Sequence, residues 1–308
     1  MTSQPTTTGG SVHQVLARLQ PRDRMLIRLL GEHQVLSTDQ IHTLLYPSRS
    51  ACQRRLARLR TLRLLHTLRA SGPAAIRWIL APLGHRLLAA EANQPLSAVK
   101  AIGLADRIAA SRHLGHQLAV NQFFTDLVAH TRTHPDARLA RWNTCPPCPE
   151  HVNPRGQGAW CRVGRTVAFY LERHTDIDTR WLLGKLARYD DAHPWCVQPG
   201  WLVLILLDQP EHEQQLHHMP SFSSLRRPVA TTVPTRHRDG PAGPIWRKAG
   251  DHHRVALHQL PGTNVDLGED WTLPHRLELP PPEHDPDAIS WQQAIAGRPH
   301  RARAGEVA

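Results

Sequence analysis

The chain has 308 residues, of which 40% are hydrophobic, which is enough for two folded domains with their own cores. Its most apolar stretch, residues 201–207 (WLVLILL), is far shorter than the roughly 20 residues of a membrane span, and residues 1–14 lack the features of a signal peptide. The net charge is +11, and five scattered cysteines do not fit a secreted disulfide scaffold. We therefore expect a cytoplasmic protein that does not bind membranes.

Two helices are predicted after a disordered N-terminus of residues 1–19. Residues 21–33 carry apolar side chains at helical spacing, and Ser37 or Thr38 can cap a second helix that contains Ile41, Leu44 and Leu45. Residues 46–48 form a turn, because proline disfavours helix at the preceding residue and can open the next helix.

A third helix is predicted within residues 48–65 (SRSACQRRLARLRTLRLL), which contain six arginines and no acidic residue. At 100° per residue, one face carries Cys52, Leu56, Leu59 and Leu62. The opposite face carries Ser50, Gln53, Arg54, Arg58 and Thr61. One face is thus suited to packing, and the other is suited to contact with a partner.

Two short apolar runs follow the third helix, at residues 64–70 and 76–81, with a Ser-Gly-Pro turn between them. They predict a two-stranded wing. Residues 20–92 therefore have the element order of a winged helix-turn-helix domain, in which the third helix reads DNA.

The positive charge is concentrated in this domain. Residues 18–86 contain 13 arginines and three acidic residues, an excess of +10, whereas the whole chain has +11. A merely soluble surface interleaves both signs, whereas a phosphate-binding surface concentrates one sign. Arginine outnumbers lysine by 34 to 3 in the whole chain, so the preference for arginine is not itself an argument. We expect double-stranded DNA to be the partner.

The exposed face of the third helix provides the expected DNA contacts. Arg54 and Arg58 suit the O6 and N7 acceptors of guanine in the major groove, and Gln53 suits adenine, with Ser50 and Thr61 beside them. The arginines expected to hold phosphates are Arg49, Arg55, Arg60, Arg69 and Arg77.

Residues 104–262 are predicted to form a mixed α/β domain, after a short connection at residues 91–100. The expected elements are a long helix at 104–130, a strand at 138–142, a Pro/Cys/Gly-rich loop, a strand at 166–171, a helix at 178–190 and a strand at 201–207. From residue 220 onward the chain holds twelve of its 26 prolines and loses periodicity, which predicts extended or partly disordered structure. Residues 263–308 form a Pro-rich tail.

One group of side chains has the chemistry of zinc ligands: Cys145, Cys148, His151 and Cys161. A single CxxC without a second matched pair is not specific for zinc, and its two internal prolines remove backbone donors that steady the thiolates. We therefore expect no bound zinc.

Several segments together resemble the replication-relaxation family of bacterial plasmid-associated proteins, common in actinobacteria, over residues 20–262. The segments that carry the resemblance are the winged-helix pattern, residues 116–121 (HQLAVN) with Phe123 and Phe124, residues 167–175 (VAFYLERHT), residues 185–189 (KLARY), and residues 245–246 with 255–260. In that family the central strand ends in an acidic triplet followed by threonine, and the next helix bears lysine and tyrosine. Glu172, Thr175, Lys185 and Tyr189 match that pattern. The resemblance implies a role in plasmid replication and relaxation of plasmid DNA.

The α/β domain also resembles a restriction-endonuclease-type core, in which an acid after a proline and an acid-x-Lys pair bind a divalent metal such as Mg²⁺. Here Pro154 is followed by Arg155, and the pair is replaced by Glu172-Arg173-His174. Two arginines and a histidine around one carboxylate repel a dication. We therefore expect a degenerate nuclease scaffold without a bound metal, although Lys185 could supply the missing ammonium group.

Two roles remain open for Glu172. It could be a strand-end carboxylate paired with Arg173, Lys185 or Arg188, or it could line a groove for DNA or a protein together with Thr175, Lys185 and Tyr189.

The leading hypothesis is a DNA-binding protein of a plasmid or integrated mobile element, acting in replication, DNA relaxation or its control. Its expected partners are double-stranded DNA, plasmid replication or transfer proteins, and a second copy in a homodimer. The alternatives are a metal-dependent DNA-nicking nuclease and a winged-helix transcriptional regulator.

Overall fold

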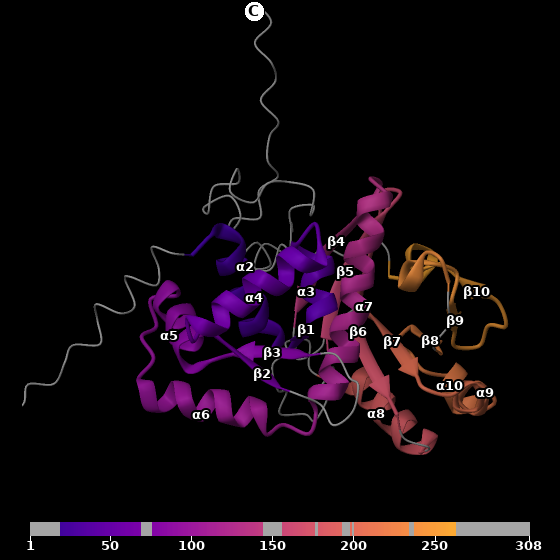
Figure 1. The fold of residues 1–308 in the computed structure, drawn as a ribbon. Coiled ribbons are helices and arrows are strands. Elements are labelled where there is room, and N and C mark those ends of the chain that lie inside the picture. The colour runs from indigo at the N-terminus through magenta and orange to yellow at the C-terminus, as the bar shows by residue number, and fades with distance from the viewer. Residues whose placement is uncertain are drawn as a thin grey trace, which may run out of the picture. The chain divides into compact units, whose positions relative to one another are not determined.

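The computed structural model describes residues 19–68, 76–143, 156–175, 178–192, 198, 200–233 and 237–262. These residues form two compact units, which divide after Leu118 (Figure 1). In the described part of the chain, no helix has both the length and the apolar character needed to cross a bilayer.

The first unit combines helices with a small sheet. Its helices are α2 (Pro21–His33), α3 (Thr38–Leu45), α4 (Arg49–Thr61), α5 (Pro82–Glu91) and α6 (Ala98–Ala109). Its strands are β1 (Leu36–Ser37), β2 (Leu65–Leu68) and β3 (Arg77–Leu80), which pair antiparallel in the order β1-β3-β2. The three predicted helices and the two predicted strands are present, and β1 adds a third strand.

Side-chain caps fix where α3 and α4 begin. The Ser37 hydroxyl accepts a hydrogen bond from the Gln40 backbone N–H at 3.1 Å, and the Gln40 side chain accepts one from the Ser37 N–H at 2.9 Å. This reciprocal capping box satisfies two backbone donors that a helix N-terminus otherwise leaves unpaired. Ser48 caps α4 by accepting from the Ala51 N–H at 3.3 Å. The predicted helix starts are therefore confirmed.

The prediction of one long helix at residues 104–130 is wrong. The structure has α6, capped by Ser97 within the predicted connection, and a separate α7 (Leu114–Thr133). In the break between them, the Ser111 hydroxyl accepts from the His113 N–H at 3.3 Å. Serine side chains compete with helical carbonyls for backbone donors, which favours such interruptions. The helix α5, which opens with Pro82, was also not predicted.

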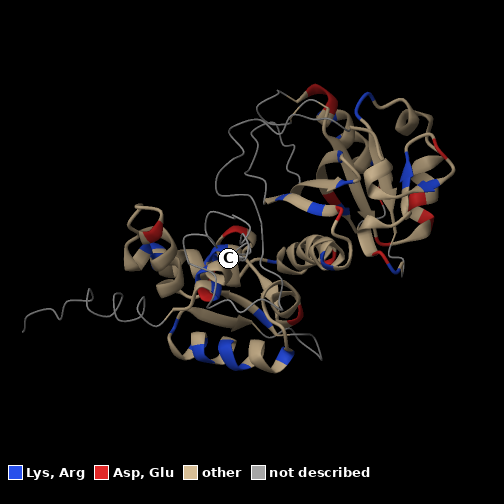
Figure 2. Cartoon of the chain, turned by 90° about the horizontal axis from the view of Figure 1, so that it is seen from above, with Lys and Arg blue, Asp and Glu red and all other residues tan. Residues whose placement is uncertain are grey.

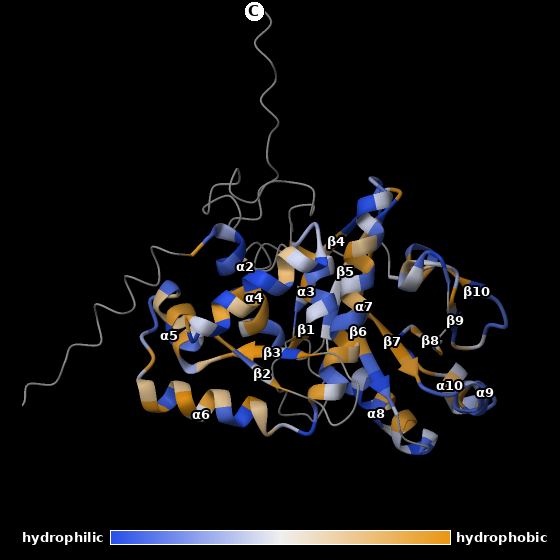
Figure 3. Ribbon diagram, in the orientation of Figure 1, coloured by the Kyte–Doolittle hydropathy of each residue, from blue (hydrophilic) through white to orange (hydrophobic). Residues whose placement is uncertain are grey.

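The second unit is built on a seven-stranded mixed sheet in the order β10-β9-β8-β7-β6-β5-β4 (Figure 1). The strands are β4 (Ala137–Asn143), β5 (Gly156–Arg162), β6 (Arg165–His174), β7 (Leu202–Leu207), β8 (Val229–Thr232), β9 (Trp246–Lys248) and β10 (Arg254–Val255). The central strands β6, β7 and β8 are parallel, and the outer pairs are antiparallel. β7 is hydrophobic along its whole length (Figure 3), as expected for a parallel strand buried on both faces.

Helices of the second unit cover both faces of this sheet. Its remaining helices are α8 (Thr179–Asp191), α9 (Pro210–His217) and α10 (Pro220–Ser223), with 3₁₀ turns η1 (Gly240–Ala242) and η2 (Leu257–Gln259). Neighbouring residues of β6 point to opposite faces: Phe169 meets Phe123 and Phe124 of α7 at 5.8 and 6.0 Å between ring centroids, whereas Tyr170 meets Tyr189 of α8 at 5.9 Å.

Two predictions for this unit are wrong. The Pro/Cys/Gly-rich segment is not a loop throughout, because its end forms β5. A side chain at Gly158 would lie 2.6 Å from the Phe124 ring and 2.7 Å from the Phe169 ring, so the glycine that suggested a loop makes room for packed aromatic residues.

Residues 220–262, expected to be extended or partly disordered, contain α10 and β8 to β10. These strands have only two to four residues, too few to show periodicity, and they are fixed by pairing with their neighbours. The predicted terminal segments, residues 1–18 and 263–308, lie outside the described residues.

Candidate functional site

The helix α4 has one buried and one exposed face. Cys52, Leu56 and Leu59 are completely buried, and Leu62 just beyond the helix is half-buried. The exposed residues of the opposite face are Ser50, Gln53, Arg54, Arg58 and Thr61. The division into two faces that helical spacing predicted is therefore confirmed. A polar face that protrudes from a packed helix is available to a partner.

The arginines of α4 fall into two groups. Arg49 pairs with Asp39, and Arg55 donates from Nε to Asp23 Oδ1 at 2.8 Å and forms an ion pair with the same carboxylate. Arg54, Arg58 and Arg60 are exposed and form no ion pair within the described part of the chain. Because α4 contains no acidic residue, Figure 2 shows the colour of Lys and Arg along this helix but not the colour of Asp and Glu. This face therefore presents uncompensated positive charge.

The ion pair of Arg55 connects α4 to α2. Asp23 is completely buried and also accepts the Gln20 backbone N–H at 2.7 Å. Arg55 is only 15% exposed. A buried carboxylate needs such partners, because removing a charge from water without compensation costs several kcal/mol. Arg55 therefore positions α4, whereas its neighbour Arg54 is exposed.

A hollow of about 760 Å³ lies beside the exposed face of α4, between this helix and the start of α2. Arg54, Arg55 and Arg58 line one side, and Arg22 lies on the other with its guanidinium 4.7 Å from the centre of the Tyr46 ring. A concave surface with several arginines and an aromatic ring suits an anionic chain.

The hairpin of β2 and β3 carries one predicted phosphate contact that the structure describes. Arg77 is half-buried and lies opposite Leu68 in the ladder. Arg69 and the turn of the hairpin lie outside the described residues.

In the second unit, Glu172 of β6 meets two side chains of α8. Lys185 Nζ lies 2.6 Å from Glu172 Oε1, and the Tyr189 hydroxyl donates to the same oxygen. All three residues are buried, at 3%, 7% and 0% exposure respectively. Of the three partners considered from the sequence, Lys185 is the one observed, since Arg173 pairs with Asp208 at 3.1 Å and Arg188 is exposed.

Thr175 is exposed, one residue beyond the end of β6. Among the described residues, no set of three metal-ligating side chains includes Glu172. Pro154 and Arg155, and the cysteine-rich candidates Cys145, Cys148 and His151, lie outside the described residues. Cys161 is a free thiol on β5, 3.2 Å from the Thr166 hydroxyl.

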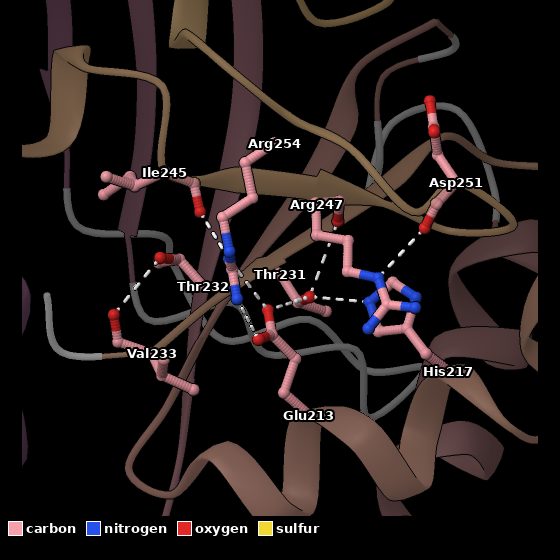
Figure 4. Close-up of polar contacts among 9 residues, drawn as sticks. All are labelled: Glu213, His217, Thr231, Thr232, Val233, Ile245, Arg247, Asp251 and Arg254. Carbon is pink, nitrogen blue, oxygen red and sulfur yellow. Dashed lines mark hydrogen bonds and ion pairs between the residues drawn. The ribbon is translucent and has the colours of Figure 1, made fainter.

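A polar network that sequence reasoning missed joins α9 to β8, β9 and β10 (Figure 4). Glu213 is 3% exposed, pairs with Arg254 and accepts the Thr231 hydroxyl at 2.6 Å. His217 Nε2 lies 2.8 Å from the same hydroxyl, and burial, with the nearby Arg247 charge, lowers the pKa of His217 to about 4. The partners are 14 to 41 positions apart, so no local pattern could have revealed the network. It holds the edge of the sheet to α9.

Comparison with known proteins gives one family. The family model described as Replication-relaxation matches residues 27–195, which is more than half of the 308 residues and includes α4, β6 and α8. No curated protein and no solved structure matches the chain. Membership of this family suggests a role related to plasmid replication. The chain belongs to the replication-relaxation family.

Proposed function

We propose that this protein binds double-stranded DNA of a plasmid or integrated mobile element and acts in its replication or relaxation, or in the control of these processes. The observation that carries the proposal is the exposed face of α4, where Arg54, Arg58 and Arg60 have no ion pair within the described chain. The family assignment supports the part of the proposal that concerns plasmid replication.

The first unit supports a winged helix-turn-helix reading. Helices α2, α3 and α4 are followed by the hairpin β2/β3, which is the element order of such a domain, and in this proposal α4 is the recognition helix. In this proposal Arg54 and Arg58 contact guanine and Gln53 contacts adenine, with Ser50 and Thr61 beside them. Arg60, Arg69 and Arg77 hold phosphates. Arg49 and Arg55 contact acids of the protein, so the proposal does not depend on them for DNA contact.

The second unit is, in this proposal, a degenerate restriction-endonuclease-like scaffold. A metal-dependent nickase would need Glu172 to bind a cation, but its Oε1 atom contacts an ammonium and a hydroxyl. Mg²⁺-dependent nicking of supercoiled plasmid that is lost in Glu172→Gln would establish that alternative instead. A transcriptional regulator would differ in its target, which would be a promoter rather than a replication or transfer origin.

The test is selection of purified full-length protein on a randomised duplex pool at two salt concentrations, followed by sequencing. We expect an enriched motif. With that motif as probe, Arg54→Ala/Arg58→Ala should weaken specific binding by roughly 30-fold to 10⁴-fold, because each bidentate base contact contributes about 1–3 kcal/mol of discrimination. Its loss of affinity for random duplex should be much smaller.

The matched variant is Arg77→Ala, in the wing. It should weaken binding to specific and random duplex by the same factor and reduce the salt slope by about 0.9, as expected for one phosphate contact. Equal losses on both duplexes for both variants would contradict this division of roles. Absence of any DNA binding would overturn the proposal.

A further inference from the structure

Two histidines lie one turn apart near the end of α7. His130 and His134 have the i, i+4 spacing that places side chains on one helix face, and their rings stack with centroids 3.8 Å apart. Asp239, immediately before η1, brings a carboxylate to them. One donor atom from each of the three residues lies within 4.8 Å of the others. All three residues belong to the second unit.

His130 has a polar atom that the described protein does not satisfy. Its side chain is 94% buried, since 6% remains exposed, and Nε2 has no hydrogen-bond partner among the described residues. Buried polar atoms in folded proteins nearly always have a partner, and a metal ion at this nitrogen would satisfy an atom that the described residues leave unpaired.

One tautomer of His134 leaves a lone pair available at its other nitrogen. Its Nδ1 lies 2.9 Å from the Thr133 hydroxyl oxygen and 3.2 Å from the backbone carbonyl oxygen of His130. In the tautomer that the metal site requires, Nδ1–H donates to that carbonyl. Nε2 then carries the lone pair. A histidine ligand that donates its second N–H to a backbone carbonyl is the usual arrangement around protein-bound metals.

The surrounding charges permit a cation. Arg162 pairs with Asp136 at 3.2 Å, so its guanidinium is held by another carboxylate. The nearest arginine to Asp239 is Arg238, 3.8 Å away, and its side chain is 89% exposed. An exposed arginine can move into solvent at little cost. His237 Nδ1 accepts the Asp239 backbone N–H at 3.1 Å, which steadies the segment that carries the carboxylate.

We propose that His130, His134 and Asp239 bind one divalent transition-metal ion of the Zn²⁺ class, which links the end of α7 to the segment before η1. Two imidazoles and a carboxylate are a suitable donor set for such ions. Bonds of about 2.0–2.2 Å require the donors to approach one another more closely than 4.8 Å. His134 and Asp239 are both partly exposed, so rotation of their side chains closes the site around the ion. A fourth position remains for water.

The proposal is tested with full-length protein stripped by a chelator and titrated with Co²⁺, and then with Zn²⁺ in competition. We expect one equivalent of Co²⁺ to give the visible absorption of a nitrogen- and oxygen-ligated site without a thiolate charge-transfer band, and Zn²⁺ to displace it. His134→Ala and Asp239→Asn should each weaken binding at least about tenfold. Both residues are partly exposed, so these variants should fold where a change at buried His130 could prevent folding; circular dichroism checks this.

The matched control is the double variant His252→Ala/His253→Ala, which removes two exposed imidazoles from the same unit. It should bind Co²⁺ as the unchanged protein does. Amide hydrogen exchange should slow on Zn²⁺ addition in the last turn of α7 and in residues 237–242. Binding that is unaffected by His134→Ala and Asp239→Asn, a thiolate band, or no stoichiometric binding would each overturn the proposal. None of these measurements involves DNA, so the outcome is independent of the proposed function.

Discussion

Replacing Arg55 by leucine tests whether the ion pair with Asp23 holds α4 in place. The change leaves a completely buried carboxylate whose remaining hydrogen-bond donor among the described residues is the Gln20 N–H. Removing one partner of a buried ion pair costs about 3–5 kcal/mol. For a unit of this size, each 1 kcal/mol lowers the melting temperature by roughly 4–8 °C. A loss of 3 kcal/mol therefore predicts a decrease of roughly 12–24 °C for the first unit.

The double variant Asp23→Leu/Arg55→Leu should recover most of this loss, because replacing both members of a buried pair by apolar residues is often nearly neutral. The matched control is Arg58→Leu on the exposed face of the same helix, which should change stability by less than about 0.5 kcal/mol.

The assay is urea unfolding of the full-length protein, with amide hydrogen exchange followed on peptides from α2 and α4 so that the first unit is read separately. A double-mutant cycle gives the coupling between the two residues. If Arg55→Leu is as stable as Arg58→Leu, or if the double variant is no more stable than Arg55→Leu, the reasoning is refuted.

Three further predictions concern stability. Lys185→Met should destabilise the second unit by about 3–5 kcal/mol in urea unfolding, because it leaves the buried Glu172 carboxylate without its ion-pair partner. The double variant Glu172→Gln/Lys185→Met should recover part of this loss. An equal loss in both variants would show that the broken ion pair does not cause the destabilisation. Gly158→Val should destabilise the same unit by at least about 1–3 kcal/mol, because the valine side chain would overlap the Phe124 ring. An unchanged urea midpoint would contradict the close packing of the Phe124 ring against Gly158. Burial lowers the pKa of His33 from 6.5 to about 3, so the unfolded chain binds more protons between these values. The contribution of neutral His33 to the free energy of unfolding is therefore fully present above pH 6.5 and is lost as the pH falls toward 3, by up to about 1.4 kcal/mol per pH unit. His33→Gln should reduce this pH dependence in unfolding series from pH 7 to 4. The same pH dependence in the variant and the unchanged protein would contradict the prediction.

Local sequence signals account well for helices α2, α3 and α4 of the first unit. Pro21, the Ser37 capping box and the Ser48 cap fixed the starts of α2, α3 and α4, because a helix start depends on a few neighbouring residues. The spacing of Cys52, Leu56 and Leu59 predicted the buried face of α4 for the same reason. These signals are short-range, and so are the structures that they determine.

Tertiary contacts decided the elements that sequence reasoning missed. Gly158 reads as a loop residue in isolation, yet it lies in a strand because Phe124 occupies the space that a side chain would need. The short strands after residue 220 exist through pairing with β7 and with one another. Whether a short segment forms a strand therefore depends on the neighbouring strand as much as on its own residues.

The sequence by itself determined helices α2, α3 and α4 of the first unit, the basic exposed face of α4 and, through the family resemblance, the grouping of Glu172 with Lys185 and Tyr189. Only the tertiary structure decided which charges are compensated, such as Arg55 by Asp23, and it alone brought Asp239 to His130 and His134. The physical reason is that periodicity and capping act over a few residues, whereas an ion pair or a ligand cluster depends on side chains from distant segments that folding brings within a few ångströms.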